Sequence, residues 1–556
     1  MSVVDVPPAE VVPPVERETG SRLPRLLLWA LVPVPVVLAV VEVLRSPRLN
    51  FNDYWAVLAK VADQDGGLRF SPLFDLYNEH PITLVGPVFW LDAKFFDGYN
   101  WTLGIANVVL VLILLAALVT MLPARLAGTP RAAVVAGIAL MLFSSSALEY
   151  FGMGMSGMHW LLGLVPAVVA LRFAHRGNTV AAVLFGVLGC FGHGSAFPVW
   201  AGLALIAWLR RDQLWRVVLP MGLGVLTLVL WLLPSRPVSY PTSALIGADT
   251  VLGTAVGMLG QVWAARSADV AFVTGTATVV LFAILLLRRV PRRPAAESTV
   301  DDPGWFGLAL HVVLVAVMVG ASRSRFGTGE ALGPRYAMVA LLGACALLVL
   351  LVLHGPRLAR LNVVPLALVM GLATYAVGSA QSTAVRENYP LQPVLAVAMK
   401  VEAPSVIESM NSTTKVLPVL RALHAYPFND SFSLGCKGYE LGDLVDMSRV
   451  AELPGPVGSS KTAGAVETGP VRGDAKVFGW AVIDGKAADC VMVVDGGSVV
   501  VGGGAVGVPR ADVASTTHTT GRGGWHAVAK PGVQDAVVLV GAGGRLYRVT
   551  LVVQVG

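Results

Sequence analysis

The chain has 556 residues, of which 55% are hydrophobic and only 14% are charged. A soluble protein has about a quarter charged residues, so most of this chain is not expected to face water. The formal charge of +6 does not indicate a nucleic-acid-binding protein, because Lys and Arg lie in short clusters between apolar runs. The composition therefore predicts a membrane protein that needs a lipid bilayer and no nucleic acid.

The N-terminal segment is predicted to be a cytoplasmic tail. Residues 1–25 are polar and rich in Pro, which indicates disorder. The apolar run that follows is long enough to span a bilayer and has no obvious small-residue cleavage site. We therefore expect a retained first helix, not a cleaved signal peptide.

About eleven apolar runs are candidates for membrane-spanning helices, which need about 20 residues each. They lie at residues 26–45, 101–122, 132–149, 158–172, 178–192, 195–209, 216–234, 268–287, 305–321, 336–353 and 363–380. Together they predict a polytopic, mainly α bundle, a membrane domain over residues 26–380.

The basic residues between these runs predict the orientation, because Lys and Arg stay on the cytoplasmic side. With the N-terminus inside, every inner loop is basic; these loops contain Arg125, Arg131, Arg172, Arg176, Arg210, Arg211, Arg216, Arg288, Arg289, Arg292, Arg293, Arg357 and Arg360. Arg45 and Arg48, at the outer end of the first run, are exceptions. An odd number of spans places the C-terminus outside, in a multi-pass plasma-membrane protein.

Two outer segments between the runs are too long to be turns. Residues 46–100 interleave aromatic and acidic side chains, and stretches 54–64 and 82–97 are predicted to be amphipathic helices at the membrane interface. Residues 235–267 form a second outer segment, with two prolines near its start.

The part of the chain after the last run is predicted to form an extracytoplasmic domain. Residues 381–455 are expected to be a helical connector and residues 456–475 a linker, since they are rich in Gly, Pro, Ser and Thr. Residues 476–556 are expected to be a β-sandwich. Its short β-type segments begin near residues 477, 490, 498, 524, 535 and 546.

Four side chains in this outer part leave alternatives open. Cys436 and Cys490 could form a disulfide in an oxidising compartment, or remain two unpaired buried thiols. Trp480 and Trp525 could stack on sugars or belong to the core of the β domain.

Acidic residues of the first outer segment are the candidates for catalysis. Asp53, just after the first span, could remove a proton from a hydroxyl group as general base, or simply cap a helix. Glu79 and His80 precede Pro81, which suits the first turn of a helix; Glu79 is a second candidate base. Asp53, Glu79 and His80 could also ligate a divalent cation, Mg²⁺ or Mn²⁺, and His80 could instead bind a phosphate oxygen of the donor.

Cationic and imidazole side chains at other outer helix ends are candidates for binding a phosphate or substrate. Arg335 begins a helix in GPRYAM, and Arg323 and Arg325 precede it in SRSRFG. A guanidinium group matches phosphate oxygens, although an interfacial Arg could also only snorkel. His159 and His193 could complete the site. His311, inside an apolar run, is predicted to be structural.

The architecture resembles the GT-C superfamily of polytopic glycosyltransferases. The resemblance is in the first span, the long acidic outer loop with Asp53, the many further spans and the C-terminal β domain. It implies transfer of a sugar from a polyprenyl-phosphate donor to a glycan or lipid acceptor on the outer face, as in cell-envelope and cell-wall biogenesis. It also implies that an acid of the first outer loop is the base; paired acids are common there, whereas here Asp53 is followed by Tyr54.

Two other functions are compatible with the sequence. A transporter or flippase of a lipid-linked saccharide would carry internal repeats and polar groups near the membrane midplane, and neither is evident. A non-catalytic membrane scaffold would use the outer domain to bind a glycan. No GxxxxGK[ST], HExxH or GxSxG motif occurs in a suitable context, which argues against a nucleotide-driven pump, a zinc protease and a serine hydrolase.

Overall fold

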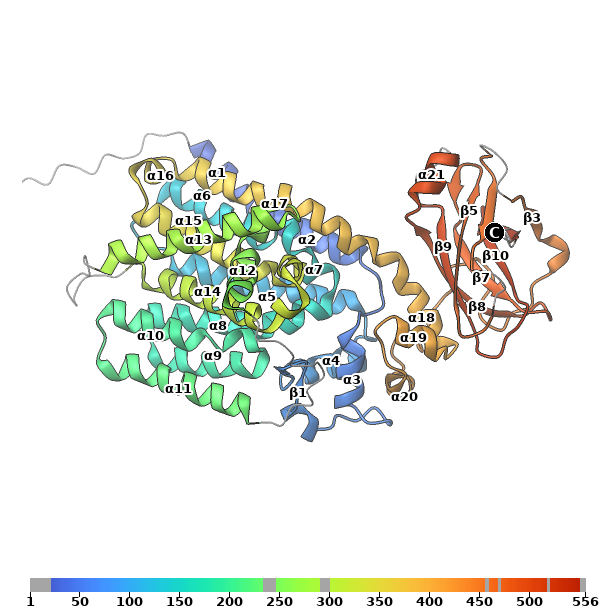
Figure 1. Ribbon diagram of the computed structural model, residues 1–556, viewed down its shortest axis with the longest axis horizontal. Helices are drawn as coiled ribbons and strands as arrows, with labels where there is room; N and C mark the ends of the chain where they lie inside the picture. The colour runs from blue at the N-terminus through green and yellow to red at the C-terminus, as the bar shows by residue number, and fades with distance from the viewer. Residues whose placement is uncertain are drawn as a thin grey trace, which may run out of the picture.

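The computed structural model describes residues 22–233, 247–290, 301–455, 460–468, 472–517 and 521–550. Most of the predicted tail, residues 1–25, therefore lies outside the described residues. The protein is mainly helical, with a bundle of long helices joined through a helical connector to a β-rich domain (Figure 1).

The apolar runs form the long helices of the bundle. In the described residues, nine helical segments are long and apolar enough to cross a membrane: Arg22–Arg45, Asn100–Met121, Gly128–Gly152, Gly154–His175, Leu214–Leu232, Ala268–Arg289, Pro303–Phe326, Pro334–His354 and Val363–Lys400. The runs at 178–192 and 195–209 also become helices, but these are shorter than a full span. Eleven crossings and their orientation thus stay a prediction.

The individual helices of the bundle are α1 (Arg22–Leu31), α2 (Pro33–Arg45), α5 (Asn100–Met121), α6 (Gly128–Leu142), α7 (Leu148–Gly152), α8 (Gly154–His175), α9 (Thr179–Gly192), α10 (Val199–Arg210), α11 (Leu214–Leu232), α12 (Ala248–Gly260), α13 (Ala268–Arg289), α14 (Pro303–Arg323), α15 (Ala337–His354), α16 (Arg357–Leu361) and α17 (Val363–Glu387). Helix α12 lies within the predicted outer segment 235–267 and packs against α13 and α14. Its Thr254 and Met258 are fully buried, so this segment is partly core.

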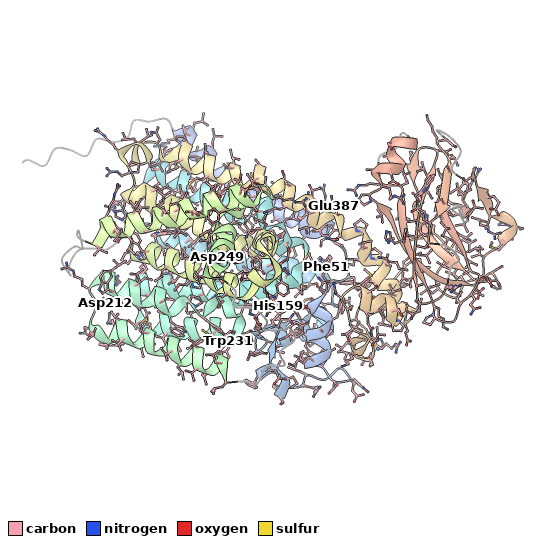
Figure 2. The ribbon with its side chains drawn as sticks, in the orientation of Figure 1. Phe51, His159, Asp212, Trp231, Asp249 and Glu387 are labelled. Atoms are coloured by element: carbon pink, nitrogen blue, oxygen red, sulfur yellow. A yellow bond between two sulfur atoms is a disulfide. The ribbon has the colours of Figure 1, made fainter. Side chains whose placement is uncertain are left out.

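The two ends of the helical bundle differ in the segments that lie there. Asp212 marks one end, at the turn between α10 and α11, and Trp231 marks the other end of α11 (Figure 2). The short helix α16, with Arg357 and Arg360, lies at the Asp212 end, whereas the connector and the β domain extend from the opposite end (Figure 1). Near the Asp212 end a buried ion pair joins Arg289 to Asp302, with 2.5 Å between Nε and Oδ2.

The first outer segment folds into α3 (Asp53–Val61), a two-stranded hairpin of β1 (Leu76–Tyr77) and β2 (His80–Pro81), and α4 (Val85–Phe95). The helices lie close to the predicted stretches. In α3, Trp55 and Leu58 are fully buried in a core shared with the connector. The position of these helices at the lipid interface stays a prediction.

The connector begins with an extension of the last bundle helix. Helix α17 continues past residue 380 to Glu387 and is followed by α18 (Gln392–Lys400), α19 (Pro404–Ser409) and α20 (Leu417–Ala422). An ion pair ties α17 to the first span, with the Arg386 guanidinium donating to both carboxylate oxygens of Glu42 at 3.1 and 2.5 Å. Helix α18 packs on the β domain, so the connector contacts both parts of the protein.

The β domain is one curled sheet and not the expected sandwich. Its strands are β3 (Ala451–Leu453), β4 (Ala463–Val466), β5 (Lys476–Ile483), β6 (Lys486–Ala487), β7 (Cys490–Val494), β8 (Val500–Val508), β9 (Gly524–Ala529), β10 (Val537–Ala542) and β11 (Arg545–Val549). The order is β3-β11-β10-β7-β8-β9-β5-β4, with β6 paired to β5. The two edges meet through hydrogen bonds from Gly464 N to Pro454 O and from Val466 N to Thr550 O, both 3.0 Å. This contact makes the sheet barrel-like.

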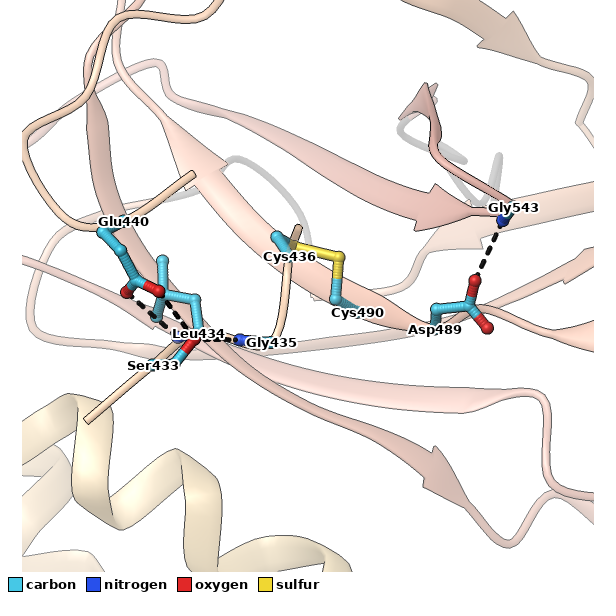
Figure 3. Close-up of a disulfide and its surroundings, with 8 residues drawn as sticks. All are labelled: Ser433, Leu434, Gly435, Cys436, Glu440, Asp489, Cys490 and Gly543. Carbon is cyan, nitrogen blue, oxygen red and sulfur yellow. Dashed lines mark hydrogen bonds between the residues drawn. A yellow bond between two sulfur atoms is a disulfide. The ribbon is translucent and has the colours of Figure 1, made fainter. Parts of the chain in front are cut away.

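The structure decides between the alternatives left open for the two tryptophans and the two cysteines of the outer part. Trp480 and Trp525 are 8% and 1% exposed, so both are core residues. Cys436 of the connector and Cys490 of β7 form a disulfide (Figure 3). Strand β4 lies inside the predicted linker 456–475, so the sheet begins before residue 476.

Candidate functional site

A cavity of about 520 Å³ lies where the outer segment meets the ends of the bundle helices. Side chains predicted to act in substrate binding and catalysis all line it: Asp53, Glu79, His80, His159, His193, Arg323, Arg325 and Arg335. They come from α3, the β1–β2 hairpin, α8, the α9–α10 turn, the last residue of α14 and the chain between α14 and α15. Figure 2 shows two residues of this cavity, His159 and Trp231, at the end of the bundle nearer the β domain.

Asp53 is the first residue of α3 and is only partly buried. The N-cap is Asn52, whose φ of 33° is in the left-handed region that Asn tolerates better than most residues. Asp53 does not cap the helix; its Oδ1 accepts a hydrogen bond from the Tyr77 hydroxyl at 3.0 Å. A neutral donor orients the carboxylate and leaves its negative charge in place, as a general base requires.

Glu79 and His80 lie in a hairpin, so their expected position at a helix entry is wrong. Tyr77 pairs with His80, and Asn78 and Glu79 form the two-residue turn with φ values of 46° and 71°. Turns of this length match strand twist when both residues have positive φ. The Glu79 carboxylate lies 3.8 Å from the Arg325 guanidinium, and the Trp231 indole donates to the Glu79 backbone oxygen at 2.9 Å.

Aromatic and imidazole rings form one wall of the cavity. The rings of His80 and His193 stack with centroids 4.0 Å apart, and the Trp160 ring is 4.4 Å from His193. A hydrogen bond of 2.9 Å joins His193 Nδ1 to the Ser195 hydroxyl, so Nε2 is the ring nitrogen left for a ligand. Nε2 of His159 is buried, and no hydrogen-bond partner for it is present in the described residues.

The three arginines differ in their partners. Arg335 pairs with Glu330, and its backbone oxygen accepts a hydrogen bond of 2.6 Å from the buried Tyr150 hydroxyl. Arg325 faces Glu79. Arg323 has no ion pair with a carboxylate in the described residues. Its charge is thus the most available of the three to an anionic ligand.

Several lining residues were missed from the sequence. Glu149 adds a third carboxylate, which accepts a hydrogen bond from the Ser156 hydroxyl at 2.7 Å. Trp231 also lines the cavity, although it ends a helix expected only to span the membrane. Both residues lie near helix ends that are predicted to be outer ends, which is the signal that identified the other candidates. His311 is fully buried and does not line the cavity, so its structural role stays a prediction.

The predicted cation site is not evident from the geometry. Among the described residues, no group of three or more His, Cys, Asp or Glu side chains is arranged to hold a metal ion. Asp53, Glu79 and His80 share the cavity without forming such a group. Binding of Mg²⁺ or Mn²⁺ there remains a prediction.

No family model, curated protein or solved structure matches this chain. The function is therefore inferred from the chemistry of the cavity and the architecture around it.

Proposed function

We propose that the protein is a membrane glycosyltransferase that moves a sugar from a polyprenyl-phosphate donor to a glycan or lipid acceptor of the cell envelope. The observation that carries this proposal is the single cavity that contains both Asp53 and the three arginines. Its volume of about 520 Å³ is in the range of small-molecule sites. A carboxylate in one cavity with several guanidinium groups suits a reaction that needs a base and an anionic leaving group.

The transfer is a single displacement in which the atoms balance. The acceptor hydroxyl oxygen forms a bond to the anomeric carbon of the donor sugar, and its proton passes to a carboxylate. The bond from the anomeric carbon to the phosphate oxygen breaks, and polyprenyl phosphate leaves with the electron pair. A single displacement inverts the configuration at the anomeric carbon.

Asp53 is the better candidate for the base. Its carboxylate interacts with the Tyr77 hydroxyl, whereas Glu79 faces the positive charge of Arg325. A carboxylate that faces a guanidinium has fewer oxygen lone pairs left for an acceptor hydroxyl. Glu79 and Arg325 are then better suited to bind sugar hydroxyls and phosphate oxygens, together with Arg323 and Arg335.

The leaving phosphate is assigned to the arginine group. Arg323 has the least neutralised guanidinium, and Arg335 is anchored through Tyr150. His80 and His193 add ring nitrogens beside the same space. Cationic and hydrogen-bonding groups that face the developing phosphate charge lower the barrier to its departure.

Two observations support an outer position for this cavity. Basic residues such as Arg210 and Arg357 lie at the opposite end of the bundle, which is the cytoplasmic end under the positive-inside rule. The disulfide between Cys436 and Cys490 suits an oxidising compartment. We infer that α9 and α10 also cross most of the bilayer, which gives eleven spans with the C-terminus outside the plasma membrane.

The test is a transfer assay with the protein reconstituted in lipid nanodiscs. Labelled polyprenyl-monophosphate pentoses and hexoses are offered with cell-envelope glycan acceptors, and both labelled glycan and released polyprenyl phosphate are measured. Asp53→Asn is expected to lose about 10²–10⁴-fold in turnover, the usual contribution of a general base. The control is Asp65→Asn, an exposed acid of the same segment that does not line the cavity.

The same variants separate the alternatives. A transporter would move a labelled lipid-linked saccharide across a vesicle membrane at equal rates in wild type and Asp53→Asn, with no transferred sugar. A scaffold would show neither transfer nor transport. Either result would reject the transferase assignment.

A further inference from the structure

A buried acid lies behind the candidate base, outside the cavity. Asp92 of α4 is 3% exposed, and its Oδ2 accepts a hydrogen bond from the Tyr54 hydroxyl at 2.8 Å. Tyr54 is fully buried and directly follows Asp53 in α3. The contact therefore connects the core of the outer segment to the helix turn that carries Asp53.

The surroundings of Asp92 suit a neutral carboxylic acid and not a carboxylate. No ion pair with Asp92 is present in the described part of the chain, and an unpaired buried carboxylate is costly. Its titratable neighbours are Tyr54 on α3 and Asp97 after α4, neither of which supplies a positive charge. The Phe89 ring of α4 packs against the Tyr54 ring and against the His159 ring of α8, with centroids 4.7 and 5.4 Å apart.

Two buried side-chain oxygen atoms near Asp92 have no hydrogen-bond donor within the part of the chain that the structure describes. Oδ1 of Asp92 and Oδ1 of Asn50 are both buried without a hydrogen-bond partner in the described residues. Nδ2 of Asn50 is occupied, since it donates to the Gly98 backbone oxygen at 3.0 Å. A carboxylate has no proton to donate, whereas a carboxylic acid has one O–H donor. Burial accordingly raises the pKa of Asp92 to about 8.

Two residues whose side chains interact with Asp92 lie on both sides of the candidate base. Asn50 precedes Asp53 by three residues and Tyr54 follows it, and between them Asn52 adopts a φ of 33°. A left-handed residue persists only where its neighbours are held in place. The direction of the Asp53 side chain thus depends on two anchors that converge on one region of α4.

We propose that Asp92 is a positioning residue that works as a neutral acid, holding Asn50 and Tyr54 and thereby directing Asp53 into the cavity. This inference rests on the proposed function in one respect, the role of Asp53 as base. The neutral state of Asp92 and its hold on α3 do not depend on the reaction.

The test compares three variants in the nanodisc transfer assay. Asp92→Asn keeps a neutral hydrogen-bonding side chain of the same size and is expected to retain turnover within about threefold of wild type. Asp92→Leu removes both anchors, and a displaced catalytic group can cost about 10²-fold in rate. That loss is expected in kcat, with the KM for the donor within about threefold, because the donor-binding arginines lie on other elements. Asp97→Asn is the matched control, since Asp97 is exposed and has a φ of 59° that Asn also adopts.

The outcomes separate the inference from the proposed function. Equal losses in Asp92→Asn and Asp92→Leu would overturn the neutral-acid role, and an unchanged kcat in Asp92→Leu would overturn positioning. If Asp92→Leu does not fold, Tyr54→Phe decides: a lower kcat with an unchanged KM supports positioning, and an unchanged kcat overturns it. If wild type and Asp53→Asn are equally active, the assignment of Asp53 as base has failed, and the pH dependence of unfolding still tests the neutral acid.

Discussion

The Tyr77 hydroxyl donates a hydrogen bond of 3.0 Å to Oδ1 of Asp53, which fixes the β1–β2 hairpin to the first turn of α3. Tyr77→Phe removes this donor and keeps the aromatic ring. A hydrogen bond to a charged group contributes about 1.5–3 kcal/mol, so kcat of the transfer reaction is expected to fall about tenfold or more, and less than in Asp53→Asn. Tyr547→Phe, on β11 far from the cavity, is the control. Wild-type turnover in Tyr77→Phe would show that the bond does not orient the base.

Substitutions of Glu79 can separate its effect on the β1–β2 turn from the effect of its negative charge on donor binding. Its φ of 71° is unfavourable for Glu and favourable for Gly. Glu79→Gly is therefore expected to keep or raise the thermal unfolding temperature while it removes the carboxylate beside Arg325. Glu79→Gln removes the charge and keeps the strain. If the carboxylate binds substrate, both variants raise the KM for the donor to a similar extent. A normal KM in Glu79→Gly would assign Glu79 to the turn alone.

The raised pKa of Asp92 predicts how stability varies with pH. The unfolded chain ionises Asp92 near pH 4, whereas the folded protein keeps it neutral up to about 8. The stabilising contribution of the neutral acid is complete below about pH 4 and is lost as the pH rises to about 8, at up to about 1.4 kcal/mol per pH unit.

Unfolding temperatures measured in detergent between about pH 5 and pH 9 check this dependence. Asp92→Asn should flatten the decline, because its amide does not titrate, and Asp65→Asn, at an exposed acid that is not among the groups acting on Asp92, should leave the decline unchanged. Identical pH profiles for wild type and Asp92→Asn would contradict a neutral Asp92.

Two neighbouring acids at the other end of the bundle, Asp301 and Asp302, are expected to differ in how much stability the protein loses when each is replaced by Asn. Asp302 and Arg289 have side chains only 4% and 7% exposed, and they pair at 2.5 Å. Asp302→Asn removes a buried carboxylate that pairs with this guanidinium and lies 2.6 Å from His354 Nε2, and it is expected to cost about 3 kcal/mol or more. Asp301 pairs with Arg125 on the surface at 3.0 Å, so Asp301→Asn should cost no more than about 1 kcal/mol. Unfolding measurements of both variants test the contrast, and equal costs would contradict it.

The helices, and most residues of the candidate site, could be predicted from the sequence. Apolar length predicts a spanning helix directly, and every predicted run became a helix. His193 and Arg335 were identified because ionisable residues at the outer ends of helices share one membrane depth. The same rule applies to Glu149, which lines the cavity but was not among the predicted site residues.

Other features depend on contacts between distant residues. Glu42 lies in an apolar run, and its partner Arg386 is 344 residues away. The Asn78–Glu79 turn lacks the Gly that usually marks a two-residue hairpin. The barrel-like sheet needs a parallel pairing between β3 and β11, at opposite ends of the domain sequence. The local sequence does not show which distant strands pair. The β-sandwich was therefore predicted from the spacing of the strands alone.

The most direct test of the account is an electron cryomicroscopy structure of the protein in nanodiscs with a bound polyprenyl-monophosphate sugar. With Arg323 as the phosphate ligand and Asp53 as the base, we expect phosphate density in the cavity within hydrogen-bond distance of Arg323. The anomeric carbon is expected between that phosphate and the Asp53 carboxylate. Phosphate density outside the cavity, or a sugar held away from Asp53 with the arginines unoccupied, would contradict it.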